Sequence, residues 1–591
     1  MRLKKVLMTT LATALVLSTF GLDGQGHVAN AEKTVATMAP SQDIFAPVLD
    51  GGSNKEHTHG STIVKLHNGE MMAAWFQGNG ERDGTTTRIM ASRLPVGATE
   101  WTTPFVLADT PRIADINPAL YMDDRERLWL FWYPVLAGRW ETSQPKYLYA
   151  EKGNYEYANG YEQTPKWDWQ DAIYVRLGDH PFGVQPTDPF VLNLEAKLKE
   201  FENYTFKPQQ DGGAGMNEIF RNDWAQFAIE RMRLAKGSVY SIKEGYPLGR
   251  RLGFQTKDKP YSFKLADGAT RMILPLYSDN LEFSVMAITD NYGETWSFSE
   301  PIVGMAIIQA SMVKKKDGTL VAYLRDNGKA PYRVVYSESK DNGMTWTIGM
   351  DRNDLFDYGV GHDLTILPNG NWVFVHNNVE DGRYSLAVLL SDDDGKTWSY
   401  RRHIETDRRA ERGDYHYPAV ISDAEGNIHI TYTVDYTSAD VDKDGNSLAN
   451  YNNIKYLKID EDWIKEGDAK DASEQVVYSY EKFDLVIDGS TVDEANMDQS
   501  TGKIAITELE KLSLPTEVNG YLTYLNPLPN GKTQEVKLGV SWNLTELANK
   551  YKPNSWIKDI PGVIDTANLP EGFAANLLPE IAPKLTIYIQ K

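Results

Sequence analysis

The chain has 591 residues, a formal net charge of −21, 41% hydrophobic and 24% charged residues, and no cysteine. This length exceeds one ordinary core, so it predicts either two domains or one large repeat architecture. The acidic balance argues against nucleic acid as a partner, because phosphate binding needs a basic surface, but it allows a local basic pocket for one acidic sugar. The lack of cysteine excludes disulfides, thiol chemistry and a lipid-modified N-terminal cysteine.

Residues 1–31 have the pattern of a secretory signal peptide. A basic start at Arg2, Lys4 and Lys5 precedes an apolar stretch over residues 6–22, and Ala29-Asn30-Ala31 offers a small-residue cleavage site. Threonines and a serine interrupt the apolar stretch, which is shorter than a bilayer span. We therefore expect a secreted, extracellular protein without a membrane span.

A strand–turn–strand pattern occurs six times. The paired strands cover residues 61–66 with 70–76, 117–122 with 128–133, 261–265 with 270–277, 309–314 with 319–324, 363–367 with 371–376, and 417–422 with 427–434. Most of the turns contain Asn-Gly, Asp-Gly or Glu-Gly, and the first two of these are typical of β-hairpins. Six hairpins predict six blades, and so an all-β, six-bladed β-propeller over residues 32–470.

Residues 185–249 interrupt the repeat. Leu192–Tyr204 and Asn217–Leu234 have helical periodicity, which predicts a partly helical insertion between the second and third blades, near the mouth. This insertion is either a packing extension or a wall or lid over the substrate.

Three octapeptides follow the pattern S-x-D-x-G-x-T-W or a close variant. They span residues 289–296, 339–346 and 391–398, and a decayed copy ends at Trp101. Their glycines, Gly293, Gly343 and Gly395, lie 50 and 52 residues apart, which is the length of a four-stranded blade. The motif suits a structural turn, in which Asp or Asn accepts backbone N–H bonds, Gly adopts positive φ and Trp is buried.

Two further features follow towards the C-terminus. Asp440, Asp442 and Asp444 copy the first half of a calcium-binding loop, but the twelfth position is Tyr451 rather than Glu. The segment is either a structural Ca²⁺ site or an Asp-rich turn, and we expect no cofactor to be required. Residues 471–591 predict a separate, β-rich accessory domain, such as a β-sandwich, which either binds glycan or only packs; its strands include Glu535–Trp542 and Lys584–Ile589.

The octapeptides resemble the Asp-boxes, or BNR repeats, of the sialidase superfamily. Further segments are similar to the bacterial sialidase-like branch: His59-Gly60-Ser61-Thr62, Ile116-Asn117-Pro118, the run from Arg251 to Thr256, the run from Leu276 to Asp279, the run from Tyr323 to Gly328, and Tyr415-His416-Tyr417-Pro418. The resemblance covers about residues 55–468 apart from the insertion. It implies a six-bladed propeller that cleaves carbohydrate at its central mouth.

The resemblance does not establish which sugar the protein binds. Classical sialidases bind sialic acid with an arginine triad and use a Tyr–Glu nucleophilic pair and an aspartic acid/base. The first arginine of the triad belongs to a Phe-Arg-Ile-Pro segment, whereas here His59-Gly60-Ser61-Thr62 stands at the first strand. The resemblance therefore implies the fold and not sialic acid specificity.

Candidate site residues lie where the first strand of each blade begins, since these openings meet around one axis. They are His59, Asn117, Lys259, Gln309, His362, Asp363, Tyr415, His416 and Tyr417. A second group consists of Arg325 and Asp326 after a second strand, Arg383 at the start of a strand, and Arg251, Lys257 and Asp258 before the third blade. Its arginines could clamp a carboxylate or form structural ion pairs, such as Arg325 with Asp326. The alternative for the first group is a hydrogen-bonded, water-filled channel lining.

Three functions fit these residues. A glycoside hydrolase that removes a terminal acidic sugar would use Asp363 and Asp326 as carboxyls and Tyr415 or Tyr417 as nucleophile. A polysaccharide lyase would use His59, His362 or His416 as base, with Arg, Asn117 or Gln309 on the uronate carboxylate. A glycan-binding propeller without catalysis is the third. We predict the hydrolase, with His59, Asp326, Asp363, Tyr415 and His416 as the catalytic set and a glycan as the partner.

Overall fold

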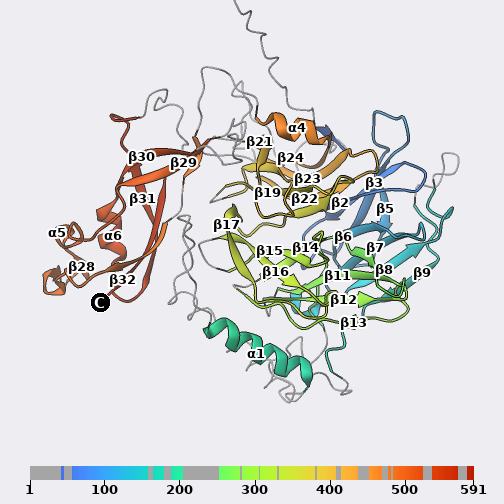
Figure 1. Cartoon of the computed structure of the whole chain (residues 1–591), viewed down its shortest axis with the longest axis horizontal. Coiled ribbons are helices and arrows are strands. Elements are labelled where there is room, and N and C mark those ends of the chain that lie inside the picture. The colour runs from blue at the N-terminus through green and yellow to red at the C-terminus, as the bar shows by residue number, and fades with distance from the viewer. Residues whose placement is uncertain are drawn as a thin grey trace, which may run out of the picture. The chain divides into compact units, whose positions relative to one another are not determined.

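The computed structural model describes residues 41–44, 56–156, 164–178, 188–203, 252–279, 282–304, 307–328, 332–379, 382–406, 414–436, 451–468, 477–480, 483–498, 500–522, 535–569 and 582–591. Six four-stranded antiparallel sheets account for residues 42–459 of this part (Figure 1). The predicted signal peptide, Arg251 and the three aspartates of the calcium-like segment lie outside the described residues.

The six sheets follow one another along the chain. The first sheet consists of β2 (His57–Lys65), β3 (Met71–Gly78), β4 (Arg88–Leu94) and β5 (Phe105–Ala108). The second consists of β6 (Asp115–Met122), β7 (Leu128–Pro134), β8 (Lys146–Ala150) and β9 (Trp169–Ala172). The third consists of β10 (Tyr261–Lys264), β11 (Thr270–Ser278), β12 (Phe283–Thr289) and β13 (Ser297–Phe298). The fourth consists of β14 (Ile307–Lys314), β15 (Leu320–Asp326), β16 (Arg333–Ser339) and β17 (Met350–Phe356). The fifth consists of β18 (Asp363–Ile366), β19 (Trp372–His376), β20 (Ser385–Ser391) and β21 (Tyr400–Thr406).

The sixth sheet closes the ring with strands from both ends of the described propeller chain. It consists of β22 (Asp414–Ser422), β23 (Ile428–Tyr436), β24 (Tyr451–Ile459) and, at its outer edge, β1 (Gln42–Asp43). Strand β2 contacts both β6 and β22, and β14 contacts β11 and β18. First strands therefore contact one another in five of the blades, as the sequence predicted, whereas the third blade contacts β14 through its second strand, β11.

All six predicted hairpins are confirmed within a few residues. Each joins the innermost strand of its sheet to the next, as β2 to β3 and β14 to β15. The turn glycines adopt the left-handed conformation, with φ of 88° at Gly69 and 93° at Gly318. In the second blade, which has no turn glycine, Glu126 adopts positive φ instead.

The octapeptide motif forms a hydrogen-bonded turn between the outer strands. In the 339–346 copy, Asp341 accepts the backbone N–H of Thr345 at 2.9 Å, and Gly343 N–H donates to Ser339 Oγ at 2.9 Å. A Cβ on Gly343 would lie 2.6 Å from Ile273 of the preceding blade. The glycine is thus needed for close approach between blades, and the structural interpretation of the motif is confirmed.

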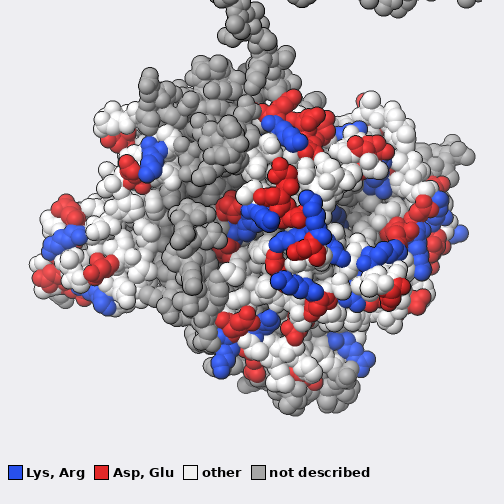
Figure 2. All heavy atoms as spheres, viewed as in Figure 1, with Lys and Arg blue, Asp and Glu red and all other residues white. Residues whose placement is uncertain are grey.

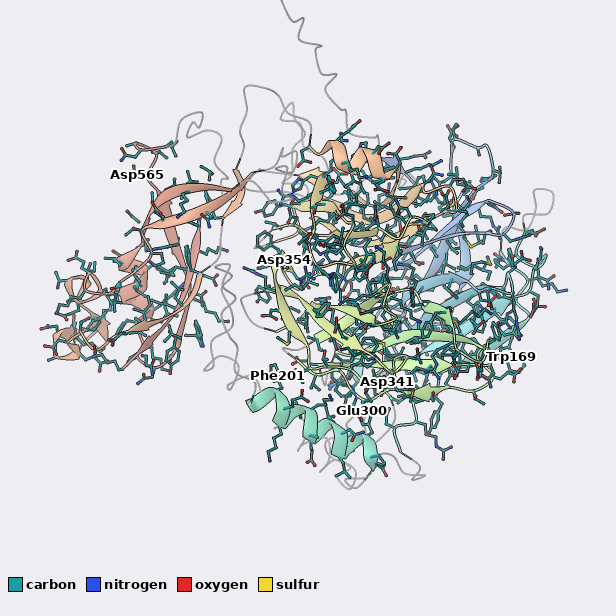
Figure 3. The ribbon with its side chains drawn as sticks, in the orientation of Figure 1. Trp169, Phe201, Glu300, Asp341, Asp354 and Asp565 are labelled. Atoms are coloured by element: carbon teal, nitrogen blue, oxygen red, sulfur yellow. The ribbon has the colours of Figure 1, made fainter. Side chains whose placement is uncertain are left out.

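The insertion contributes one described helix, α1 (Pro189–Asn203), close to the predicted range. Its apolar side packs with Phe283 of β12 in one cluster, Asn193 Nδ2 donates to Glu300, and Lys197 Nζ donates to the carbonyl of Trp346. Figure 3 marks Phe201 at the end of this helix and Glu300 beside it. Helix α1 therefore packs on the outside of the ring, and only the packing interpretation fits it; the second predicted helix lies outside the described residues.

Residues 477–591 form a second sheet with its own core. Its order is β25 (Val477–Tyr480), β29 (Glu517–Leu522), β30 (Glu535–Trp542), β31 (Trp556–Ile564), β32 (Lys584–Gln590) and β26 (Phe483–Asp488). The two strands predicted here are confirmed. The expected β-sandwich is not, because the described residues form one mixed sheet with a parallel β26–β32 pair and pack its core with two short helices, α5 (Ile506–Leu509) and α6 (Leu544–Lys550).

The surface of the six sheets shows no region of a single charge in the view of Figure 2, where basic and acidic side chains lie interspersed. Among the described residues, no helix is long and apolar enough to cross a membrane.

Candidate functional site

A repeated β-bulge turns side chains towards the propeller axis. The ladder shifts register after His59, Ile116, Ile308 and His416, each near the start of a first strand. The residue that follows each of them has positive φ: Gly60, Asn117, Gln309 and Tyr417. Positive φ costs a non-glycine residue about 1 kcal/mol, so three such residues at equivalent positions indicate a conformation kept for function.

These bulges, the ends of second strands and the connection that enters β20 bring nine polar residues together, which we call the axial basin. Its members are His59, Asn117, Tyr133, Tyr277, Gln309, Arg325, Arg383, His416 and Tyr417. They come from all six blades, and hydrogen bonds or ring contacts link each of them to another member. Five of the nine residues predicted from strand openings are among them: His59, Asn117, Gln309, His416 and Tyr417.

Tyr417 lies at the centre of the axial basin. Its phenol oxygen accepts hydrogen bonds from Arg325 Nη1 at 2.7 Å and from Gln309 Nε2 at 3.1 Å. A Cβ on Gly361 would lie only 2.5 Å from the Tyr417 ring, so glycine is required there for the ring to fit. Two donors from the fourth blade therefore fix the position of this phenol oxygen.

His59 stacks on Tyr417 and lies beside His416, whose ring is tilted relative to it. The His59 ring lies 4.1 Å from the Tyr417 ring and 4.4 Å from the His416 ring, measured between centroids. Burial, followed by neighbouring positive charge, lowers the pKa of both histidines well below the usual value. Both rings are therefore neutral at neutral pH.

Arg383 fixes the tautomer of His416. Its Nη1 donates to His416 Nδ1 at 2.7 Å, and because arginine can only donate, that ring nitrogen carries no proton. The proton of the neutral ring is then on Nε2, which is buried and has no hydrogen-bond partner among the described residues. His416 thus presents an unused N–H donor beside Arg383 and Tyr417.

Two further tyrosines complete the axial basin. Asn117 Nδ2 lies 3.4 Å from the phenol oxygens of both Tyr133 and Tyr277, and Gln309 Nε2 donates to Tyr277 at 3.2 Å. Burial raises the pKa of both phenols well above the usual value, so both stay protonated. They can donate hydrogen bonds or a proton to a bound molecule.

A second polar cluster, which we call the axial floor, consists of Lys257, Asp258, Lys259, Ser311 and Asp363. Both oxygens of Asp363 contact Lys259 Nζ, at 2.7 and 2.6 Å. The same carboxylate accepts from Ser311 Oγ and from the backbone N–H of Leu364 and Val420. Although burial opposes it, this contact with Lys259 holds the pKa of Asp363 below its usual value.

Lys257 connects the axial floor to the axial basin. Its Nζ donates to Asp258 at 2.6 Å and to the carbonyl of His362 at 2.7 Å, and it lies 5.8 Å from the centre of the Tyr417 ring. Burial raises the pKa of Asp258 to about 7, and one of its oxygens has no partner among the described residues. The axial floor is thus a bonded layer that joins the chain segments of four blades.

Several predicted site residues lie outside the axial basin. Asp326 accepts backbone N–H groups of Gly328 and Arg333, and burial with two neighbouring aspartates raises its pKa well above the usual value. His362 lies against Phe374, and burial lowers its pKa to about 3. The side chain of Tyr415 packs in the apolar core of the last two blades. Lys259 and Asp363 belong to the axial floor.

Sequence reasoning predicted seven of the nine members of the axial basin and missed Tyr133 and Tyr277. The seven are His59, Asn117, Gln309, Arg325, Arg383, His416 and Tyr417. Both missed tyrosines lie near the end of a second strand, β7 or β11. Tyr133 pairs with Ile116 as Arg325 pairs with Ile308, so the alignment of hairpins could have found it. Among the described residues, no group of three His, Asp or Glu side chains could hold a metal ion.

Comparison with known proteins agrees with this architecture. Residues 221–430 match the model of the BNR repeat-like domain. The chain is 23% identical over 185 residues to an anhydrosialidase of Macrobdella decora, matching 28% of this chain and 23% of the relative. It is 30% identical over 131 residues to a sialidase of Paraclostridium sordellii, matching 19% of this chain and 31% of the relative.

Solved structures include similar chains of low sequence identity. A leech intramolecular trans-sialidase, solved with 2,7-anhydro-Neu5Ac, has a TM-score of 0.46 at 12% identity, covering 72% of this chain and 71% of that one. A protein of unknown function from Dyadobacter fermentans has a TM-score of 0.46 at 13% identity, covering 72% and 99%.

The six radial sheets and the polar mouth define a β-propeller with a site on its axis. Within that class, the match of residues 221–430 to the BNR repeat-like domain and the similarity to two curated sialidases support a BNR-repeat protein related to the sialidase superfamily. The matched segments span less than a third of the length of either curated relative.

Proposed function

We propose that this protein is a secreted glycoside hydrolase that removes a terminal acidic sugar from extracellular glycans. The observation that carries the proposal is the excess of hydrogen-bond donors in the axial basin. Arg325, Arg383 and the free N–H of His416 come from three blades and meet beside Tyr417. Guanidinium groups bind carboxylates strongly, because their N–H groups match the two carboxylate oxygens.

Tyr417 is the nucleophile in this proposal. Its phenol oxygen, held by Arg325 and Gln309, attacks the anomeric carbon while the glycosidic C–O bond breaks, and the phenolic proton passes to water, which returns it to the acid that protonates the leaving oxygen. The leaving oxygen takes a proton from the half-exposed pair of His57 and Glu81, whose Nε2 and Oε1 lie 3.1 Å apart near His59. Water then hydrolyses the tyrosyl–sugar bond, and the phenol is restored.

A second candidate is a polysaccharide lyase, and the placement of the carboxylates favours it. Asp326 and Asp363, the two acids expected in a hydrolase, both bond to protein groups outside the axial basin. Neutral His59 could take the proton next to a uronate carboxyl, and the protonated phenol of Tyr133 could return a proton to the leaving oxygen. The C4–O bond then breaks and a C4=C5 double bond forms.

The products distinguish the two reactions. Sialyllactose, sialylated mucin, rhamnogalacturonan and ulvan would be incubated with the protein, and both reducing sugar and ultraviolet absorbance would be followed. Hydrolysis releases reducing sugar without new absorbance, whereas a lyase produces an unsaturated uronate that absorbs. We expect the first result, and absorbance growing with product would overturn the hydrolase in favour of the lyase. Neither product from any substrate would contradict both.

A further inference from the structure

The outer side of the first two blades carries an open cleft of about 580 Å³. Its lining comes from the β5–β6 connection, from β7 and β8, and from the segment that enters β9. Five side chains shape it: Asp109, Trp132, Lys146, Trp167 and Trp169. Trp132 precedes Tyr133 of the axial basin, and successive strand residues point to opposite faces. The cleft therefore lies on the other face of β7 from the axial basin.

Three tryptophans give the cleft an aromatic wall. Trp169 is 51% exposed, which is unusual for such a large apolar ring, and Figure 3 shows it at the outer edge of the ring of sheets. The indole N–H of Trp167 is buried and has no partner among the described residues. Trp132 forms the inner end, where its indole N–H donates to Asp115 at 2.7 Å.

The segment that carries Trp167 and Trp169 is held in place by its own hydrogen bonds. Asp168 accepts from Asn154 Nδ2 at 2.9 Å and from the backbone N–H of Glu151 at 2.7 Å. The backbone N–H of Asp168 donates to the carbonyl of Tyr149 at 2.9 Å. The two indoles are therefore positioned before any ligand binds, which lowers the entropy cost of binding.

Lys146 supplies a positive charge in the cleft. Its Nζ lies 5.0 Å from the centre of the Trp132 ring, and it forms no ion pair within the described part of the chain. Asp109, Thr110 and Gln170 add polar atoms to the lining. An aromatic wall with several polar groups at its edge suits a ring that has one apolar face and many oxygens.

We propose that this cleft is a second glycan-binding site, in which a pyranose ring stacks on Trp169 and an oxygen substituent lies near Lys146. It would hold a polymeric substrate on the outer side of the propeller while the axial basin acts on a terminal sugar. The volume lies within the usual range of ligand pockets and fits one or two sugar rings. Binding at this site does not depend on which reaction the axial basin performs.

The test measures binding and turnover separately in the full chain. Native gels that contain sialylated mucin, rhamnogalacturonan or ulvan would be run with the wild type, Trp169→Ala and Tyr174→Ala. Tyr174 is 56% exposed in the same blade but does not line the cleft, so it serves as the matched control. We expect Trp169→Ala to weaken retardation about tenfold, as a lost stacking contact of this kind implies, with Tyr174→Ala unchanged.

Two additional variants separate binding in the cleft from turnover in the axial basin and identify the ligand oxygen. Arg383→Ala should lose turnover but keep retardation, which separates a failure of this proposal from a failure of the proposed function. Lys146→Gln should weaken binding only at low salt if the ligand oxygen is a carboxylate, and equally at all salt concentrations if it is a hydroxyl. Retardation of the wild type by none of the polymers, or equal retardation of the wild type and Trp169→Ala, would overturn the second site.

Discussion

The axial basin and the axial floor are built from the same strand openings, yet they differ in how their polar atoms are used. In the axial floor, Asp363 bonds to Lys259, Ser311 and two backbone N–H groups. In the axial basin, the Nε2–H of His416 and the Nε of Arg325 have no partner among the described residues. A buried donor left unpaired costs about 1–3 kcal/mol, so its retention suggests that a ligand completes it.

The difference shows that convergence on an axis is not by itself evidence of catalysis. Lys259 and Asp363 reach the axis as surely as Tyr417 does, but they connect blades. What separates the two layers is the bulge, which is present at Gln309 and Tyr417 and absent at Asp363. The following predictions test this separation.

Asp363→Ala should have the largest effect on stability. It would remove a buried carboxylate that accepts from the partly exposed Lys259, from Ser311 and from two backbone N–H groups, and breaking such a pair costs about 3–5 kcal/mol. Thermal and urea unfolding should both show the loss. The conservative Lys259→Arg keeps a positive charge and should lose less; if Asp363→Ala unfolded like the wild type, the axial floor would not be structural.

Tyr417→Phe should abolish most activity and leave the fold intact. The phenol oxygen is the proposed nucleophile, so turnover should fall at least ~100-fold, while the melting temperature changes little because the ring remains. Tyr415→Phe is the matched control, since its ring packs in an apolar core two positions earlier. Equal losses in both variants would place the chemistry elsewhere.

Acid should destabilise the protein through its buried histidines, and His376 isolates the effect. Burial lowers its pKa to about 3, whereas the unfolded chain takes up the proton near pH 6.5. Above pH 6.5, His376 is neutral in both states and does not lower the free energy of unfolding. As pH falls from 6.5 towards 3, protonation of the unfolded chain lowers that free energy by about 1.4 kcal/mol per pH unit.

The measurement compares the wild type with His376→Gln across this range. The difference in free energy of unfolding should move in favour of the variant as pH falls, because the variant has no proton to take up. The raised pKa values of Asp258 and Asp357, both about 7, act in the opposite direction, but they are common to both proteins and cancel. A difference that stayed constant from pH 7 to 4 would contradict a neutral, buried His376.

Asp341→Ala should have the smallest effect. Asp341, which Figure 3 labels on the outer edge of the ring, only stabilises one octapeptide turn through Thr345, Met344 and Ser339. Loss of a cap of this type costs about 1 kcal/mol. A small decrease in melting temperature with unchanged kcat is expected, and a large loss of activity would contradict a purely structural turn.

The sequence predicted the propeller well because its signals are local. Alternating strands and turn glycines such as Gly69 and Gly318 specify each hairpin within a few residues. The outer strand β1 was not predicted, because two residues, Gln42 and Asp43, leave no periodic signal. The C-terminal sheet was predicted only in part, since its parallel β26–β32 pair joins segments about a hundred residues apart.

The site was less predictable because it depends on which way each side chain points. Tyr415 and Tyr417 look equivalent in the sequence, but the bulge at His416 sends only Tyr417 to the axis. Likewise Arg325 and Asp326 are adjacent, and the strand alternation separates them. The orientation of each side chain depends on strand register and on backbone φ, and neither can be derived from composition or residue spacing.

The pairing of β1 with β24 has a consequence for synthesis. Residues 42–43 emerge from the ribosome first, but their partners at Lys455 and Tyr456 are made more than four hundred residues later. Until then, β1 has no strand to pair with, and β2 of the first blade has no contact with β22 of the last blade. Pairing of β1 with β24 is therefore late, and a chain that lacks Gln42, Asp43 and Ile44 would have no outer strand on its sixth sheet.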